Sequence, residues 1–367
     1  MASRRQTLRY AGIALAGIPL ASCTADPNGQ PDPDTGSAPA GEPAPTTAAT
    51  ALGEPEVIAT GLEAPWSIAF HEGTPLVSER DSARVLELDA QGEPREVGVI
   101  DGASPGGEGG LLGIAVFDGF LYAYFTASDD NRIERYPLEG TAGALTLGAA
   151  QAILSGIPAA GHHNGGRIAF GPDGMLYATA GDAGNPSDAQ DRDALAGKIL
   201  RMAPDGAVPD DNPFPGSLVY SWGHRNPQGI AWDESGAMWA TEFGQNTWDE
   251  LNVVEAGANY GWPEVEGIAG DGEYIDPVQQ WGPDVASPSG MAIAGGTAYI
   301  ANLRGRRLRA VPLGDPGTSA EHYVEEYGRL RDVVTAPDGS LWVLTNNTDG
   351  RGDPGPDDDR ILRIALV

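Results

Sequence analysis

The chain is poor in cysteine, in histidine and in positive charge. Its 367 residues include one cysteine, Cys23, and five histidines. A single thiol excludes an intrachain disulfide and a multi-thiolate metal site. Lysine and arginine total 22 against 52 aspartate and glutamate, which gives a formal net charge of -30. Because nucleic acid phosphates are bound by basic surfaces, we expect no nucleic acid partner.

Long apolar runs are also scarce, and the run at residues 10–21 is too short to span a bilayer comfortably. It follows Arg4 and Arg5, a twin-arginine pattern typical of an export signal. Residues 20–23 resemble a bacterial lipobox, in which Cys23 is acylated. The sequence therefore predicts a signal peptide over residues 1–23 and an exported, extracytoplasmic protein. Its only contact with the membrane would be a lipid anchor on the outer face of the cell membrane, and a cleaved signal with an incidental cysteine is the alternative.

Residues 24–53 are rich in alanine, proline, threonine, glycine and aspartate, with almost no large apolar side chains. Such a segment cannot bury enough apolar surface to fold, so we predict a disordered tether. The folded domain is expected to cover residues 54–367.

Within that domain a two-part unit recurs six times. Its first part is a short apolar strand, a turn that is often Asp-Gly, and a second strand with an aromatic residue. Its second part is an alternating strand with a basic or polar start. The anchor positions of the six copies are Ile68, Ile114, Ile168, Ile230, Met291 and Val333.

These anchors lie 42 to 62 residues apart, close to the blade length of propeller repeats, and no helical periodicity of useful length separates them. The repeat therefore predicts an all-β fold, a six-bladed β-propeller, because radial closure protects the edges of the sheets. Residues 56–59 are expected to add the outer strand of the last blade. A β-sandwich is the alternative, but it does not explain six paired landmarks.

Chemistry-bearing residues gather in segments that do not repeat. His163 lies in a Gly-rich stretch, and histidine titrates near neutral pH, which suits a general base. Glu108 lies among five glycines at residues 106–113, where the backbone can approach a ligand closely. The alternatives are a hydrogen-bonded loop histidine and a tight turn between blades.

Three further segments carry polar side chains. Residues 221–229 include Arg225, whose planar fork of donors suits carboxylate or carbonyl oxygens. Residues 241–263 offer the hard oxygen ligands that calcium prefers, although their spacing is not an EF-hand. Arginines at 304–307 and at 329–331 suggest an anionic ligand, with surface ion pairing as the alternative.

Taken together, these motifs resemble the soluble PQQ-dependent aldose sugar dehydrogenases, the glucose/sorbosone dehydrogenase family, which are six-bladed propellers. The resemblance runs from about residue 55 to the C-terminus. The motifs that carry it are Gly-x-Gly-Gly-Leu-Leu-Gly at 107–113, His-x-Gly-Gly-Arg at 163–167, Gly-Asp at 181–182, Gly-His-Arg-Asn-Pro-Gln-Gly at 223–229, Asn-Tyr-Gly-Trp-Pro at 259–263 and Arg-x-Arg-Asp-Val at 329–333.

The resemblance implies oxidation of an aldose at the anomeric carbon to the lactone, with hydride transfer to PQQ and an electron acceptor that it does not identify. His163 would take the proton of the anomeric hydroxyl, and Asp182 would orient that histidine. Arg225 would stabilise the negative charge that develops over the reacting carbonyl.

The resemblance also implies the cofactor ligands. Asn226 would bind PQQ, and Arg329 and Arg331 would clamp its carboxylates. Arg304 stands where glucose-specific members carry a lysine that contacts PQQ, and Glu108 stands where the family usually has glutamine.

Two calcium sites are implied as well. The carbonyls of Gly244 and Gln245 would hold the calcium that polarises the quinone. Glu250, Tyr260 and Asp271 would contribute to a second, structural calcium.

Two departures from the family pattern keep alternatives open. A carboxylate at Glu108 beside an anionic cofactor is unfavourable unless calcium, arginine or a proton compensates it. His162 stands where glucose-specific members carry aspartate, which leaves the sugar undefined. The alternatives are a cofactor-free, surface-tethered propeller that binds glycan or protein, and a metal-dependent sugar lactonase.

Overall fold

The computed structural model describes residues 51–270 and 272–367. The signal peptide, the acylated Cys23, most of the tether and the proposed metal ligand Asp271 lie outside these residues. Across the described ranges, no helix is long and apolar enough to cross a membrane.

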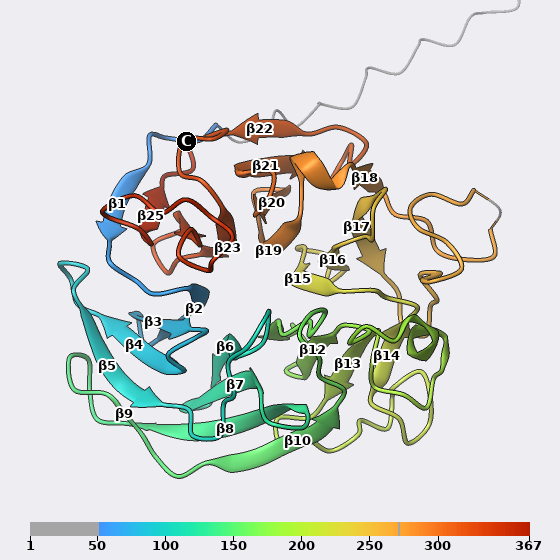
Figure 1. The fold of residues 1–367 in the computed structure, drawn as a ribbon, viewed down its shortest axis with the longest axis horizontal. Coiled ribbons are helices and arrows are strands. Elements are labelled where there is room, and N and C mark those ends of the chain that lie inside the picture. Colours follow the sequence, from blue (N-terminus) through green and yellow to red (C-terminus); the bar gives the residue numbers. More distant parts are fainter. Residues whose placement is uncertain (1–50, 271) are drawn as a thin grey trace, which may run out of the picture. The chain divides into compact units, whose positions relative to one another are not determined.

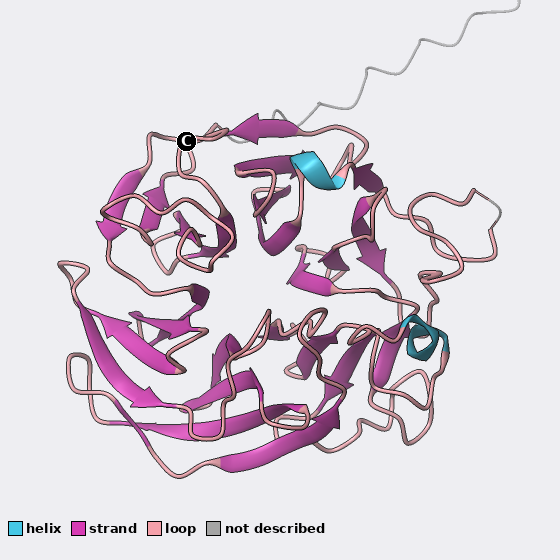
Figure 2. Ribbon diagram, viewed as in Figure 1, coloured by secondary structure: helices cyan, strands magenta, loops and turns pink. Residues whose placement is uncertain are grey.

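The strands form six antiparallel sheets, which are the blades of a propeller (Figures 1 and 2). Blade 1 holds β2 (Pro65–His71), β3 (Thr74–Glu79), β4 (Arg84–Leu88) and β5 (Pro94–Val99). Blade 2 holds β6 (Leu111–Phe117), β7 (Phe120–Thr126), β8 (Asn131–Glu139) and β10 (Gln151–Ile157), with β9 (Thr146–Leu147) paired to β8. Blade 3 holds β11 (Ile168–Phe170), β12 (Leu176–Ala180), β13 (Lys198–Met202) and β14 (Val219–Trp222).

The second half of the chain continues the pattern. Blade 4 holds β15 (Pro227–Trp232), β16 (Met238–Glu242), β17 (Asp249–Val254) and β18 (Gln279–Trp281). Blade 5 holds β19 (Pro288–Ala294), β20 (Thr297–Asn302), β21 (Arg307–Pro312) and β22 (Ala320–His322). Blade 6 holds β23 (Leu330–Thr335), β24 (Leu341–Thr345), β25 (Ile361–Ile364) and β1 (Glu56–Ala59). The six-bladed propeller is therefore confirmed, and the β-sandwich alternative is wrong.

The ring closes through the N-terminal strand. β1 pairs antiparallel with β25, with Glu56 opposite Arg363 and Val57 opposite Leu362. Residues 56–59 thus supply the outer strand of the last blade, as the sequence predicted. This pairing joins both ends of the domain in one sheet, so that the edge of blade 6 is covered.

The first strands of the blades meet around the centre of the ring (Figure 1). Each blade packs apolar side chains against the next, such as Trp66, Leu112 and Ile168 in one buried cluster. A buried ion pair crosses the centre, where Arg167 Nη1 lies 3.0 Å from Asp332 Oδ2. Because a buried charge without its partner is costly, this pair ties the third blade to the sixth.

Candidate active site

Seven of the residues singled out from the sequence lie in loops at one end of the blades. In a sheet of four antiparallel strands, the start of the first strand and the end of the second lie at the same end. Glu108, His163, Asn226 and Arg329 precede first strands, whereas Asp182, Gly244 and Arg304 follow second strands. The topology therefore brings all seven to the same face of the ring, although loops far apart in the sequence carry them.

His163 is held by a buried carboxylate. Its Nδ1 lies 2.7 Å from Oδ1 of Asp182, and the Asp182 side chain is 1% exposed. Asp182 also accepts hydrogen bonds from the Gly184 N–H, at 2.8 Å, and from the Trp262 indole, at 2.9 Å. Since an ionised carboxylate only accepts, the proton between the two residues belongs to Nδ1. The Nε2 lone pair of His163 is then free to accept another proton.

Burial alone would raise the pKa of Asp182. The hydrogen bonds from His163, Gly184 and Trp262 outweigh burial, so its pKa lies below the ordinary value. The carboxylate therefore stays ionised at neutral pH and stabilises an imidazolium whenever His163 gains a proton. This arrangement is that of a general base with an orienting carboxylate.

The backbone of His163 is constrained too. Its φ is +57°, a left-handed conformation that non-glycine residues seldom adopt. The His163 N–H donates to Oε2 of Glu108 at 2.9 Å, and the His163 carbonyl accepts from the Ala183 N–H at 3.2 Å. These bonds from two loops fix the position of the imidazole.

Glu108 connects His163 to an arginine that the sequence analysis did not select. Its Oε1 lies 2.9 Å from Nη1 of Arg351, while Oε2 accepts the His163 N–H. Burial opposes ionisation of Glu108, but these two hydrogen bonds outweigh it and keep its pKa below the ordinary value. Glu108 is thus an ionised carboxylate whose charge Arg351 compensates.

Beside this pair lies a cavity of about 330 Å³. Its lining consists of Glu108, Phe243, Ser287, Leu303, Arg304, Arg306, Arg329 and Arg351. Four arginines face one carboxylate there, in a chain that is otherwise strongly acidic. The cavity is therefore suited to a ligand with several negative charges.

The predicted arginines differ in their surroundings. Arg304 is 62% exposed and pairs with Asp284. Arg329 is buried and donates to Asp349 at 3.0 Å, but its Nε has no hydrogen-bond partner. Arg331 does not line the cavity: its guanidinium binds Gln228 at 2.8 Å and Asn346 at 3.3 Å.

Two more predicted residues carry unsatisfied donors. Arg225 donates from Nη1 to the carbonyls of Phe243 and Gly244, but its buried Nε has no partner. Asn226 accepts the Gly165 N–H at 3.0 Å, while its buried Nδ2 has no partner. Buried donors without acceptors are rare in native proteins, so these atoms indicate a missing acceptor.

The observations fit the anionic quinone cofactor implied by the resemblance. PQQ carries carboxylates and carbonyl oxygens, which are acceptors for guanidinium and amide donors. Arg304 and Arg329 line the cavity and would hold it, and Asn226 and Arg225, which do not line the cavity, would offer their unsatisfied donors. Arg306 and Arg351 extend this set.

The fit to calcium is poorer. The Gly244 carbonyl accepts a hydrogen bond from Arg225, so a guanidinium already faces that oxygen. The Gln245 N–H donates to Glu266, whose carboxylate also accepts the three following N–H groups. In the two described ranges, no group of three or more His, Cys, Asp or Glu side chains is placed to hold a metal ion.

The predicted ligands of the second calcium lie around a cavity of about 10 Å³, room for roughly one water molecule. Glu250 and Tyr260 both line it, together with Glu242 and Glu266. Glu250 accepts the Gly267 N–H at 2.7 Å, and the Tyr260 hydroxyl donates to the Val253 carbonyl at 2.7 Å. Asp271, the third predicted ligand, lies outside the described residues.

Sequence reasoning missed three residues of this region: Trp262, Arg306 and Arg351. Trp262 belongs to the Asn-Tyr-Gly-Trp-Pro motif, but the motif does not indicate that its indole N–H donates to Asp182. Arg306 belongs to a basic run that was noted. Nothing local to Arg351 in the sequence indicates that it meets Glu108, which is 243 residues away.

Comparisons with known proteins show the family. The Glucose / Sorbosone dehydrogenase family model matches residues 62–362. The PQQ-bound aldose sugar dehydrogenase of Streptomyces coelicolor is a similar solved structure, with 50% identity and a TM-score of 0.82 over 86% of this chain and 97% of that one.

Two relatives are similar in sequence. Aldose sugar dehydrogenase YliI of Escherichia coli is 30% identical over 346 residues, which cover 80% of this chain and 90% of that protein. Quinoprotein glucose dehydrogenase B of Acinetobacter calcoaceticus is 32% identical over 262 residues, which cover 60% of this chain and 54% of that protein.

Proposed function

This chain belongs to the glucose/sorbosone dehydrogenase family of oxidoreductases, and we propose that it oxidises aldose sugars with PQQ at the anomeric carbon, giving the lactone. The observation that supports this best is the pairing of His163 and Asp182 beside a cavity with four arginines. A proton acceptor and an anion site are the two features that such a reaction requires of the protein.

His163 would act through Nε2, which would take the proton of the anomeric hydroxyl. Asp182 accepts the hydrogen bond from Nδ1 and so selects the neutral tautomer whose lone pair is on Nε2. The chemistry that PQQ supplies when it is bound is acceptance of the hydride from the anomeric carbon of the sugar. Arg225 would provide positive charge where negative charge develops.

Glu108 does not argue against this cofactor once its partner is known. Its carboxylate is paired with Arg351, whose positive charge offsets the repulsion between Glu108 and an anionic cofactor that was expected from the sequence. This pairing removes the main support for a cofactor-free propeller. A sugar lactonase would need a central metal held by carboxylate and asparagine side chains, whereas the cavity beside Glu108 is lined by four arginines.

Calcium is proposed as a second cofactor on the resemblance alone. The Gly244 carbonyl, which would bind calcium, also accepts a hydrogen bond from Arg225. The physiological electron acceptor would be a separate partner, which the chain does not identify. Export and the lipid anchor at Cys23 are proposed from the sequence.

The test is a titration of the full chain with PQQ, with and without calcium, followed by aldose-dependent reduction of an artificial dye. Wild-type protein is expected to bind PQQ at micromolar or lower concentration and to turn over. His163→Gln should bind PQQ and fail to turn over, since glutamine has no basic nitrogen. No PQQ binding at micromolar cofactor would refute the proposal, and binding that is independent of calcium would refute only the calcium requirement.

A further inference from the structure

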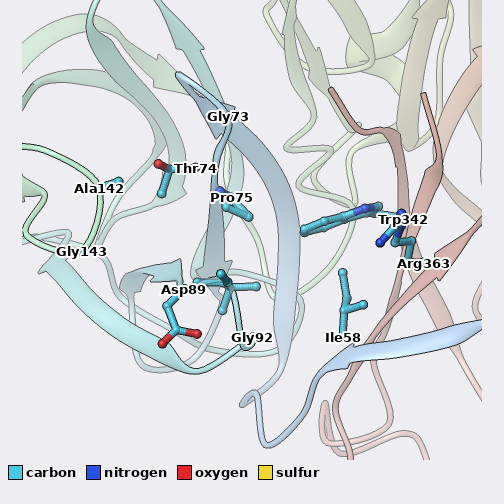
Figure 3. A pocket seen from close by; sticks show the side chains of 12 residues that line it. Ile58, Gly73, Thr74, Pro75, Asp89, Gly92, Ala142, Gly143, Trp342 and Arg363 are labelled. Atoms are coloured by element: carbon cyan, nitrogen blue, oxygen red, sulfur yellow. The ribbon is translucent and has the colours of Figure 1, made fainter. Parts of the chain in front are cut away.

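A cavity of about 530 Å³ lies where blade 6 meets blade 1 (Figure 3). Its lining includes Gly73, which lies in the turn after the first strand of blade 1. Such turns lie at the opposite end of a blade from the loops that precede first strands, where His163 lies. This cavity therefore belongs to the other face of the ring. One set of contacts that does reach the candidate active site from outside its own cavity comes from blade 4.

Arg225 is held by the loop that follows β16 in blade 4. Its Nη1 donates to the carbonyls of Phe243 and Gly244, and the buried Nε of the same guanidinium has no partner. The guanidinium also lies over the indole of Trp262, with 5.4 Å between Cζ and the ring centroid, and that indole donates to Asp182. The direction of the two carbonyls therefore decides where Arg225 presents its free donor in the candidate active site.

Both carbonyls belong to peptide groups whose N–H is held by a carboxylate. In a planar trans peptide group the C=O and N–H bonds point in opposite directions. The N–H that shares a peptide group with the Phe243 carbonyl is that of Gly244, which donates to Oδ1 of Asp249 at 2.9 Å. The N–H that shares one with the Gly244 carbonyl is that of Gln245, which donates to Oε1 of Glu266 at 2.6 Å. Each carboxylate thus turns one carbonyl toward the same guanidinium.

Glu266 orients more than one peptide group. Its Oε1 also accepts the N–H groups of residues 246, 247 and 248, at 3.0, 3.0 and 3.2 Å. Successive N–H groups that converge on one anionic oxygen form a concave turn around it. This turn requires glycine at position 244, because a Cβ on Gly244 would lie 1.7 Å from the Trp248 carbonyl oxygen and 2.8 Å from Oε1 of Glu266. The position of one carboxylate oxygen therefore sets the shape of the loop.

The two carboxylates differ in what else they hold. Asp249 is buried, and its Oδ2 accepts the Ser287 N–H at 2.6 Å, so that it also ties blade 4 to the segment before blade 5. Glu266 is half-buried and lies between β17 and β18. Within the part of the chain that the structure describes, the hydrogen bonds of its side chain all go to residues 245–248. Glu266 is therefore the carboxylate whose replacement tests the loop without loosening the contact between blades.

We propose that Glu266 is a positioning residue for the oxidation, which orients Arg225 through the peptide group between Gly244 and Gln245. This rests on the proposed function, in which Arg225 provides positive charge where negative charge develops. Glu266 does not line the cavity of the four arginines, so it acts on the reaction through the loop. The place of its oxygen matters more than its charge, because a neutral carbonyl oxygen also accepts N–H groups.

Two conservative variants of the full chain separate the position of the oxygen from its charge. Glu266→Gln keeps an oxygen at the same reach, and its turnover number at saturating PQQ should stay within about threefold of wild type in the dye assay. Glu266→Asp keeps the charge and withdraws the oxygen by one methylene group. Its turnover number should fall at least about tenfold, because a misplaced guanidinium stabilises the transition state less. Glu264→Asp is the matched control, an exposed residue of the same segment, and it should turn over as wild type does.

A second readout needs no cofactor. In ¹H–¹⁵N spectra of the full chain without PQQ, the Nε–H signal of Arg225 is identified by its loss in Arg225→Lys. It should shift in Glu266→Asp and stay in place in Glu266→Gln and Glu264→Asp.

The proposal is overturned if Glu266→Asp turns over as wild type does, or if either Glu266→Gln or Glu264→Asp loses as much turnover as Glu266→Asp. An Nε–H signal of Arg225 that is the same in wild type and Glu266→Asp would overturn it as well. If wild type binds no PQQ, the proposed oxidation fails, and the Nε–H signal alone decides whether Glu266 positions Arg225. The two proposals can therefore fail separately.

Discussion

Replacing Arg351 by alanine should weaken PQQ binding without unfolding the protein. The Arg351 side chain is 57% exposed and the Glu108 side chain is 18% exposed, with 2.9 Å between Nη1 and Oε1. An ion pair with one partner this exposed contributes about 0.2–1 kcal/mol to stability. The loss should lower the free energy of unfolding by no more than that, because Glu108 keeps its hydrogen bond from the His163 N–H.

The variant also changes the electrostatics of the cavity toward an anionic cofactor, because it removes one positive charge. The variant removes one cation from the cavity wall and leaves the Glu108 carboxylate uncompensated. A unit charge about 4 Å from another contributes roughly 1 kcal/mol even at the dielectric constant of water. The loss of this one charge gives about 1 kcal/mol, or roughly fivefold weaker binding.

A four-variant cycle separates this electrostatic effect from damage to the site. Glu108→Gln keeps an acceptor for the His163 N–H, frees Arg351, and should bind PQQ more tightly than wild type. The double variant loses one charge of each sign and should bind within about threefold of wild type. Arg132→Ala is the control, because Arg132 pairs with Asp130 and does not line the cavity. Absorbance titration of PQQ measures all five proteins, and the reasoning fails if Glu108→Gln does not restore binding to Arg351→Ala.

Three further predictions test other parts of the chain. Asp182→Asn should lower the turnover number by at least about 100-fold with PQQ affinity little changed, because the amide cannot stabilise the imidazolium; near-normal turnover in the dye assay would contradict the assignment. Burial lowers the pKa of Lys198 to about 8, so the unfolded chain binds more protons between pH 8 and the unperturbed lysine value. Stability should therefore rise with pH across that window, by up to about 3 kcal/mol from this group, and the rise measured by denaturant unfolding should be absent in Lys198→Met. Cys23→Ser should abolish incorporation of labelled palmitate and release the exported protein from the membrane fraction, whereas labelling that persists in the variant would exclude Cys23 as the acylated residue.

The fold could be predicted because its signal is local and repeated. Each blade has its own apolar strand, turn and aromatic position. Six copies of such a unit are compatible with few architectures. The closing strand was predictable for a similar reason, since a strand at the start of the domain needs a partner edge. The register of the pairing between β1 and β25 was not predictable. Its irregularity between Val57 and Ala59 depends on packing between the two strands, which the sequence of one strand does not specify.

Residues of the site were predictable only where they belong to a sequence motif. His163 and Asp182 are 19 residues apart, in motifs that the family resemblance marks, and the structure joins them. Arg329 and Arg331 form one motif, yet only Arg329 reaches the cavity. Arg331 lies within β23 and points to Gln228 and Asn346, whereas Arg329 precedes the strand. The direction of a side chain depends on whether its residue lies inside or outside a strand. The ends of strands are the part of a secondary-structure prediction that local sequence patterns determine least.

Glu108 shows why a departure from a family pattern cannot be judged by its own position. Taken alone, a carboxylate in an anion site is unfavourable, and it argued for a propeller without cofactor. In the structure the same carboxylate bonds to Arg351 and to the backbone of His163, so it joins the base to the anion cavity. The substitution and its compensation lie 243 residues apart and meet only because the propeller closes. A glutamine at this position could keep the bond to His163 but could not pair with Arg351 as an ion, so the charge of Arg351 would then act on the cofactor alone.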